Sequence, residues 1–400
     1  MHAVSTAREV PPSSPAPIAG RIASIDIIRG AVMVLMALDH VRVYSGLPPG
    51  GPSPGIFFTR WVTQFCAPAF VFLAGTSAFL AGQKSRDKGE LSRYLLIRGA
   101  LLVLLELTVI RFFWTFNLEV TALLAGVIWA IGWSMIILAL LVRLPLVVTA
   151  LIGIGILILH NLSDVLLTGD GAPGSLLSWL WQVAYGGGPI GGSEGGAILF
   201  VLYSLVPWVG VMAAGYAFGA IVVMEPARRR RLCLTIGLGA TALFLVLRGL
   251  DGYGNPSPWQ GSRLPPLLAF LNPAKYPASL DFLLMTLGPT IALIPLLEQA
   301  RGAMSRILTV FGRVPLFYYL LHIPLIHLLA MVASLVREGS VNPWLFANHP
   351  AMVGPPPEGY AWSLGLLYLV WAVSVVVLYF PCRWYAERKM NSATGWTRYL

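Results

Sequence analysis

The chain has 400 residues, of which 57% are hydrophobic and only 11% are charged. Soluble domains carry about 25% charged residues, so this composition excludes a soluble enzyme and predicts an integral membrane protein. The net charge of +10 does not indicate nucleic-acid binding, because the basic residues fall in short loops between apolar segments, which is the positive-inside pattern. Three widely spaced cysteines without a CxxC motif predict neither a disulfide framework nor a zinc site.

Residues 1–22 are rich in Pro, Ser and Ala and are predicted to form a disordered cytoplasmic tail. Residues 23–385 then form one transmembrane domain, an all-α bundle of about ten helices, and residues 386–400 form a cytoplasmic C-terminal tail. Each predicted span is an apolar run near the roughly 20 residues that cross a bilayer. The spans are Ile27–Tyr44, Phe57–Ala81, Tyr94–Ile110, Val120–Leu141, Leu144–His160, Ile198–Val223, Leu232–Leu250, Leu280–Leu297, Pro315–Val336 and Ala361–Phe380.

Lysine and arginine in the loops give the orientation of the bundle. The loops after the second, sixth and eighth spans and the C-terminal tail are basic, and all of them fall on one side when ten spans are counted. The long segment Asn161–Ala197 contains acidic residues but no Lys or Arg, and it falls on the other side. We therefore expect both termini to be cytoplasmic and Asn161–Ala197 to be extracytoplasmic. Within it, Ser175–Tyr185 is too short to span and is predicted to be an interfacial helix.

The first span holds an unusual set of ionisable side chains, with Asp26 and Arg29 at its start and Asp39, His40 and Arg42 at its end. Arg29 and His40 are eleven residues apart (40 − 29), which is three helical turns plus about 20°. They therefore share one helix face, roughly 16 Å apart along the axis. Charged groups in a spanning helix are costly, so this set predicts a functional site. For Arg29 alone, snorkelling to the interface is an equally good interpretation.

Two other spans carry candidate residues. Arg98 lies about one turn inside the cytoplasmic edge of the third span, where it either binds phosphate or snorkels. The ninth span has Arg313 at its cytoplasmic mouth and His322 near mid-membrane. His327 lies about 140° round the helix from His322, so the two do not form a metal-binding pair. Taken alone, His322 is more typical of a structural hydrogen-bonding residue than of a catalyst.

These residues resemble a known family. Arg29 followed eleven positions later by His40 resembles the signature of the transmembrane acyltransferase superfamily. The fuller pattern Ile25–Gly30 with Leu38–Arg42 is similar to the heparan-α-glucosaminide N-acetyltransferase catalytic-domain family, in particular its bacterial members. Further similar stretches are Gly126–Met135, Val206–Gly210, Asn272–Pro277, Met285–Pro289 and Arg313–Tyr319 with His322.

The resemblance implies an enzyme of the bacterial inner membrane that moves an acetyl group from cytoplasmic acetyl-CoA to an extracytoplasmic hydroxyl or amine, on a sugar or glycan. His40 is then the catalytic base or nucleophile, with Asp39 beside it in the sequence. The lysosomal member has its catalytic histidine between the first two spans, but residues 46–64 contain none here, so heparan itself is not implied as acceptor. Arg29, Arg98 and Arg313 are expected to bind the phosphates of CoA. Asp26, Arg42, Trp208, Lys275 and His322 are expected around the substrates.

Two other interpretations remain open. In a secondary transporter or proton-coupled carrier, His40, His322 and Glu106 would form a proton path, although no internal repeat is visible. In an assembly component without chemistry, His40 would be dispensable. No metal-binding or nucleotide-binding motif is present. The expected partners are the lipid bilayer, a CoA thioester and the acceptor, and a homodimer is one option for the oligomeric state.

Overall fold

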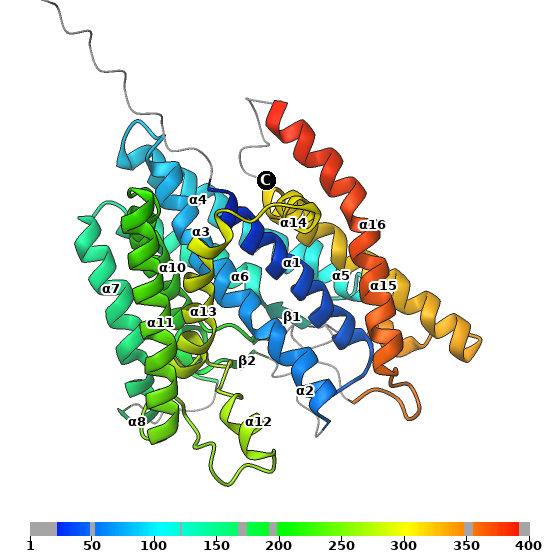
Figure 1. The fold of residues 1–400 in the computed structure, drawn as a ribbon. Helices are drawn as coiled ribbons and strands as arrows, with labels where there is room; N and C mark the ends of the chain where they lie inside the picture. The colour runs from blue at the N-terminus through cyan, green and yellow to red at the C-terminus, as the bar shows by residue number, and fades with distance from the viewer. Residues whose placement is uncertain are drawn as a thin grey trace, which may run out of the picture.

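The chain is described by a computed structural model that covers residues 22–48, 53–120, 122–166, 174–191, 198–347 and 355–391. The helices lie alongside one another as a bundle (Figure 1). Six helices within the described residues are long and apolar enough to cross a membrane. This confirms the predicted helical membrane bundle, while the count of ten spans and the side on which each terminus lies stay predictions. Residues 1–21 of the predicted N-terminal tail and residues 392–400 of the predicted C-terminal tail (386–400) lie outside the described residues. Residues 386–391 of that tail belong to the last helix of the bundle.

Helices occur where all ten spans are predicted. They are α1 (Ala23–Tyr44), α2 (Pro54–Trp61) with η1 (Val62–Phe65) and α3 (Cys66–Gly82), α4 (Lys88–Leu105) with η2 (Glu106–Ile110) and α5 (Arg111–Thr115), α6 (Val127–Leu141), α7 (Leu146–Leu159), α10 (Leu205–Val222), α11 (Pro226–Leu250), α13 (Leu280–Leu297), α15 (Pro315–Glu338) and α16 (Leu364–Asn391). Of the four that are not among the six, α1 and α4 carry several charged residues, and α6 and α7 are short. The shorter helices are η3 (His160–Leu162), α8 (Ser163–Leu166), α9 (Leu176–Trp181), η4 (Gln182–Gly186), α12 (Pro266–Phe270), α14 (Ala303–Arg313) and η6 (Pro343–Phe346).

Helix α1 is the central element of the bundle. It packs against α3, α13, α14, α15 and α16, and most of its residues are buried. A helix that is apolar on all sides belongs in such a core. Its charged ends fit there because they form ion pairs at i,i+3 spacing, Asp26 with Arg29 and Asp39 with Arg42.

A three-stranded sheet corrects the all-α prediction. Its strands are β1 (Ala122–Ala125), β3 (Ile198–Val201) and β2 (Gly188–Ile190), in that order. β1 and β3 are parallel, with Leu123 opposite Leu199, and β2 pairs antiparallel to β3. The spans predicted at Val120–Leu141 and Ile198–Val223 therefore begin as strands. A short apolar run does not distinguish a strand from a buried helix, because only pairing with a distant segment decides.

Helix α14 is a second correction, since its residues are predicted only as a basic loop. It has eleven residues, too few to span a bilayer. Its apolar side includes the fully buried Phe311, which packs edge-on against Tyr318 of α15. It lies near the N-terminal end of α1 and the C-terminal end of α16 (Figure 1).

The crossing of α1 and α14 depends on two glycines. A Cβ atom added to Gly30 would overlap the carbonyl oxygen of Leu308, and one added to Gly312 would overlap that of Asp26. We therefore expect Gly312→Ala to lower the free energy of unfolding by about 1–3 kcal/mol, because a rigid helix crossing must separate to admit the methyl group. The measurement is the thermal unfolding midpoint of the protein in detergent.

Gly239→Ala on α11 is the matched control for this prediction. No atom lies within 4 Å of a Cβ built at Gly239, and alanine is the better helix former. Equal losses of stability in the two variants would show that the close crossing is unimportant.

Candidate active site

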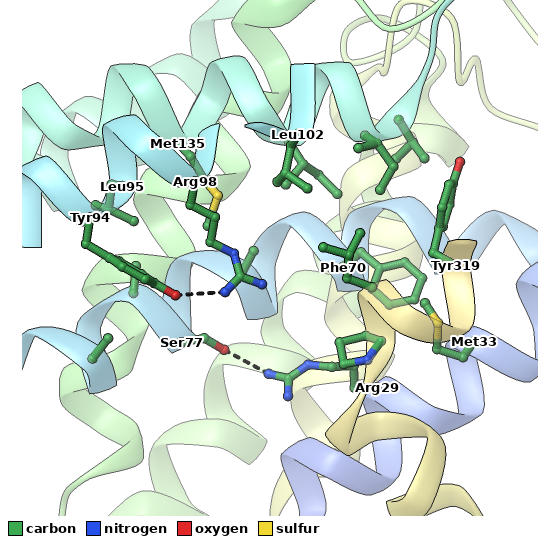
Figure 2. A pocket seen from close by; sticks show the side chains of 18 of the residues that line it. Arg29, Met33, Phe70, Ser77, Tyr94, Leu95, Arg98, Leu102, Met135 and Tyr319 are labelled. Atoms are coloured by element: carbon green, nitrogen blue, oxygen red, sulfur yellow. Dashed lines mark hydrogen bonds between the residues drawn. The ribbon is translucent and has the colours of Figure 1, made fainter. Parts of the chain in front are cut away.

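A cavity of about 250 Å³ lies beside the N-terminal half of α1, and we call it the Arg29 cavity. Arg29 from α1, Arg98 from α4 and Arg313 from the end of α14 all line it. These are the three arginines that the sequence places on the cytoplasmic side. The structure thus brings the predicted phosphate-binding residues to one place, with Met33, Phe70, Leu102 and Met135 among the apolar residues around them (Figure 2).

Neighbouring hydroxyls hold two of these arginines in place. Arg29 Nη2 donates a hydrogen bond of 2.8 Å to Ser77 Oγ, and Arg98 Nη1 donates one of 2.7 Å to the Tyr94 hydroxyl (Figure 2). Arg29 Nη1 also lies 3.3 Å from Asp26 Oδ1 and 3.3 Å from the Gly312 carbonyl oxygen. Asp26, predicted near the substrates, thus contacts Arg29 from the preceding turn of α1.

Ser77, Tyr94 and Lys389 also line this cavity and are not among the predicted site residues. The contact of Tyr94 with Arg98 could have been predicted, because Tyr94 lies four residues before Arg98 and therefore on the same helix face. Lys389 was placed in the C-terminal tail, but α16 continues to Asn391 and carries Lys389 to the cavity wall.

A second cavity of about 600 Å³ lies at the other end of α1, and we call it the His40 cavity. Asp39, His40 and Arg42 line it together with Lys275. Further polar and aromatic lining residues are Arg60, Gln64, Glu106, Trp114, Tyr203, Tyr276, Tyr319 and Trp344. A cavity with both charges and aromatic rings is suited to a polar organic ligand.

The imidazole of His40 contacts α15 and not its neighbour in the sequence. His40 Nδ1 lies 2.6 Å from His322 Nε2, and the two rings are nearly parallel, with planes 21° and centroids 4.8 Å apart. The indole of Trp114 packs edge-on against His40 at 4.7 Å. Asp39 instead accepts hydrogen bonds from Arg42, with Oδ1 3.0 Å from Nε.

Two further predicted residues lie near the His40 cavity. Lys275 Nζ sits 5.8 Å from the ring centre of Tyr203 and 5.2 Å from that of Tyr276. Trp208 does not line either cavity. It is 1% exposed and packs against Tyr203 with ring centres 5.3 Å apart, so it supports the wall of the cavity.

Glu106 reaches the His40 cavity from a π-helical turn in the helix that continues α4. Its Oε1 lies against Gly126 at the start of α6, and its Oε2 is buried without a hydrogen-bond partner among the described residues. π-Helical turns like the one that contains Glu106 are often found at functional sites. The carboxyl group lies at the positive N-terminal end of α6.

Tyr319 on α15 lines both cavities. Its ring lies at the far end of the Arg29 cavity from Tyr94 (Figure 2). It packs edge-on against His322 with ring centres 5.1 Å apart, and it is 4% exposed. Tyr319 is not among the predicted site residues, although its spacing of three residues from His322 puts both on one face of the helix.

The comparisons with known proteins support the resemblance. The chain matches the family described as heparan-alpha-glucosaminide N-acetyltransferase, catalytic, over residues 21–249. This match covers more than half of the 400 residues and includes α1, Arg98 and the strands β1 and β3. No curated protein matches the chain. Together with the apolar helical bundle, the match shows that the chain belongs to the catalytic-domain family of heparan-alpha-glucosaminide N-acetyltransferase, a family of membrane acetyltransferases.

Proposed function

We propose that this protein takes an acetyl group from acetyl-CoA at the Arg29 end of the bundle. It transfers the group to a hydroxyl or amine at the His40 end. The acceptor is a sugar or glycan, and the protein resides in the inner membrane of a bacterium. The observation that carries the proposal is that the two cavities lie along one helix and share Tyr319. A donor held in the first cavity can therefore present its reactive end to the second.

The Arg29 cavity has the chemistry that the phosphates of CoA require. Guanidinium groups form short, charge-assisted hydrogen bonds with phosphate oxygens, often two at a time. Arg29, Arg98 and Arg313 come from three different helices and line the same cavity, so a CoA molecule bound there has three guanidinium groups available for its phosphates. The extended pantetheine arm then runs along the apolar wall toward Tyr319, parallel to the face of α1 that joins Arg29 to His40.

The His40 cavity has the chemistry for the acceptor. His40 lies within it and can take the proton from a hydroxyl or amine that attacks the thioester. Lys275, Arg60 and the Asp39–Arg42 pair line its walls and can donate or accept hydrogen bonds with hydroxyl groups. The ring of Tyr276, which is 42% exposed, offers a flat apolar surface to the face of a sugar.

Binding of CoA esters tests this proposal directly. We expect acetyl-CoA and CoA to raise the thermal unfolding midpoint of the purified protein, because a ligand that binds only the folded state stabilises it. Desulfo-CoA keeps the phosphates and is expected to stabilise as well, whereas free pantetheine lacks them and is not. No shift with any CoA ester would overturn the proposal and favour the carrier interpretation.

The orientation of the bundle makes a separate prediction. The loops at the Arg29 end are basic, so this end should be cytoplasmic. We expect cysteines placed at Lys88 and Arg230 to react with membrane-impermeant thiol reagents only after the cells are opened. A cysteine at Gly187 should react in intact cells. The native cysteines are buried and give a low background. Labelling of the Gly187 site only in opened cells would reverse the topology.

A further inference from the structure

The hydrogen bonds of His322 go beyond those that a purely structural role requires. Its side chain is fully buried on α15. Its Nδ1 lies 2.6 Å from the carbonyl oxygen of Tyr319 and 3.2 Å from that of Tyr318, within its own helix. Its Nε2 lies 2.6 Å from Nδ1 of His40. Both ring nitrogens are thus committed, one to backbone and one to the histidine at the centre of the proposed site.

This arrangement permits one pattern of protons. A carbonyl oxygen only accepts hydrogen bonds, so His322 Nδ1 must carry a hydrogen. Burying an unpaired charge is costly. The groups that hydrogen-bond to His322 are two carbonyls and an imidazole, none of which carries a negative charge. His322 is therefore neutral, and its Nε2 carries a lone pair instead of a hydrogen. His40 Nδ1 must then donate its hydrogen to His322. In the neutral form of His40, which a base requires, the second nitrogen, Nε2, is then unprotonated.

We propose that His322 is a positioning residue that fixes the tautomer of His40, so that Nε2 of His40 serves as the base in acetyl transfer. The inference rests on the proposed function. No hydrogen-bond partner within the described part of the chain occupies His40 Nε2, and His40 lines the acceptor cavity. The free lone pair is therefore available to a bound acceptor.

The transfer step balances with these groups. The lone pair of His40 Nε2 takes the proton from the acceptor hydroxyl or amine. The acceptor oxygen or nitrogen forms a bond to the thioester carbonyl carbon, and the carbon–sulfur bond breaks. CoA leaves as a thiolate, which then takes the proton from His40. During the step the imidazolium of His40 donates from Nδ1 to His322, which stabilises the charge where it forms.

His327 shows what a structural histidine looks like on the same helix. It is fully buried like His322, and its Nδ1 lies 3.2 Å from a carbonyl oxygen, that of Phe113. Its ring is stacked between those of Phe116 and Tyr44. It makes no contact with His40, so a polar substitution at His327 tests burial alone.

Two substitutions of His322 separate positioning from packing. The amide of glutamine reaches roughly the place of Nε2 and can accept from His40, whereas the amide of asparagine reaches only the place of Nδ1. We expect His322→Asn to lower kcat by at least about tenfold, toward the roughly 10²–10⁴-fold that loss of a general base costs, with CoA affinity unchanged. His322→Gln should recover most of the lost turnover, and His327→Asn should keep wild-type turnover.

Nitrogen-15 NMR reads the tautomer itself and requires no activity. The chain has six histidines, so the signals of His40 are assigned by their loss in His40→Gln. We expect the wild type to carry the hydrogen on Nδ1 of His40, and His322→Asn to shift it to Nε2 or to mix the two forms. Equal turnover of the two His322 variants, or a hydrogen on Nε2 in the wild type, overturns the proposal. A wild type without transferase activity refutes the proposed function but leaves the NMR result as the test of the tautomer.

Discussion

Replacement of His40 by alanine is expected to stop acetyl transfer while CoA binding is kept. The side chain lies in the His40 cavity, outside the cavity that the three arginines line. Removal of a general base typically lowers the rate by about 10²–10⁴-fold. The measurement is release of CoA from acetyl-CoA by the purified protein in the presence of acceptor, together with the thermal shift caused by CoA.

The outcome at His322 completes this test. His322→Ala should also be impaired, because it leaves His40 without its hydrogen-bond acceptor, but it should retain more activity than His40→Ala. Wild-type turnover in His40→Ala would refute the mechanism. An inactive His322→Ala beside an active His40→Ala would move the chemistry to α15.

Removal of the arginines of the Arg29 cavity is expected to weaken CoA binding, whereas removal of His40 is expected to leave it intact. A hydrogen bond to a charged group contributes about 1.5–3 kcal/mol, so Arg29→Gln and Arg313→Gln should each weaken CoA binding by about 10- to 150-fold. Turnover at saturating acetyl-CoA should change less, because these side chains lie away from His40. The measurement is the dissociation constant of CoA by calorimetry in detergent.

Arg229→Gln provides the matched control. Arg229 is another arginine of the basic loops, but it forms an ion pair with Glu298 at 2.6 Å and does not line either cavity. Its loss should leave CoA binding intact. Arg29→Lys should weaken binding less than Arg29→Gln, since the charge remains but the two-pronged geometry is lost. Normal CoA binding in both Arg29→Gln and Arg313→Gln would place the donor site elsewhere.

The helical architecture of this protein can be predicted from the sequence because the bilayer allows few backbone structures. Only helices and closed barrels satisfy every backbone group in hydrocarbon, so apolar runs of sufficient length predict the helical bundle. Helical geometry is equally local, so the spacing of Arg29 and His40 puts both on one face of α1. The cost of buried charge makes that helix a candidate functional site.

Contacts between distant segments required the tertiary structure. The strands β1 and β3 pair across segments far apart in the chain, and α14 is too short to be found by a criterion of length. The meeting of His40 with His322, 282 positions later in the chain, depends on how α1 and α15 pack. The sequence predicts which side of the membrane each ionisable group approaches. The packing alone decided which of these groups touch, because helix-to-helix contacts arise from side-chain shape that no local pattern records.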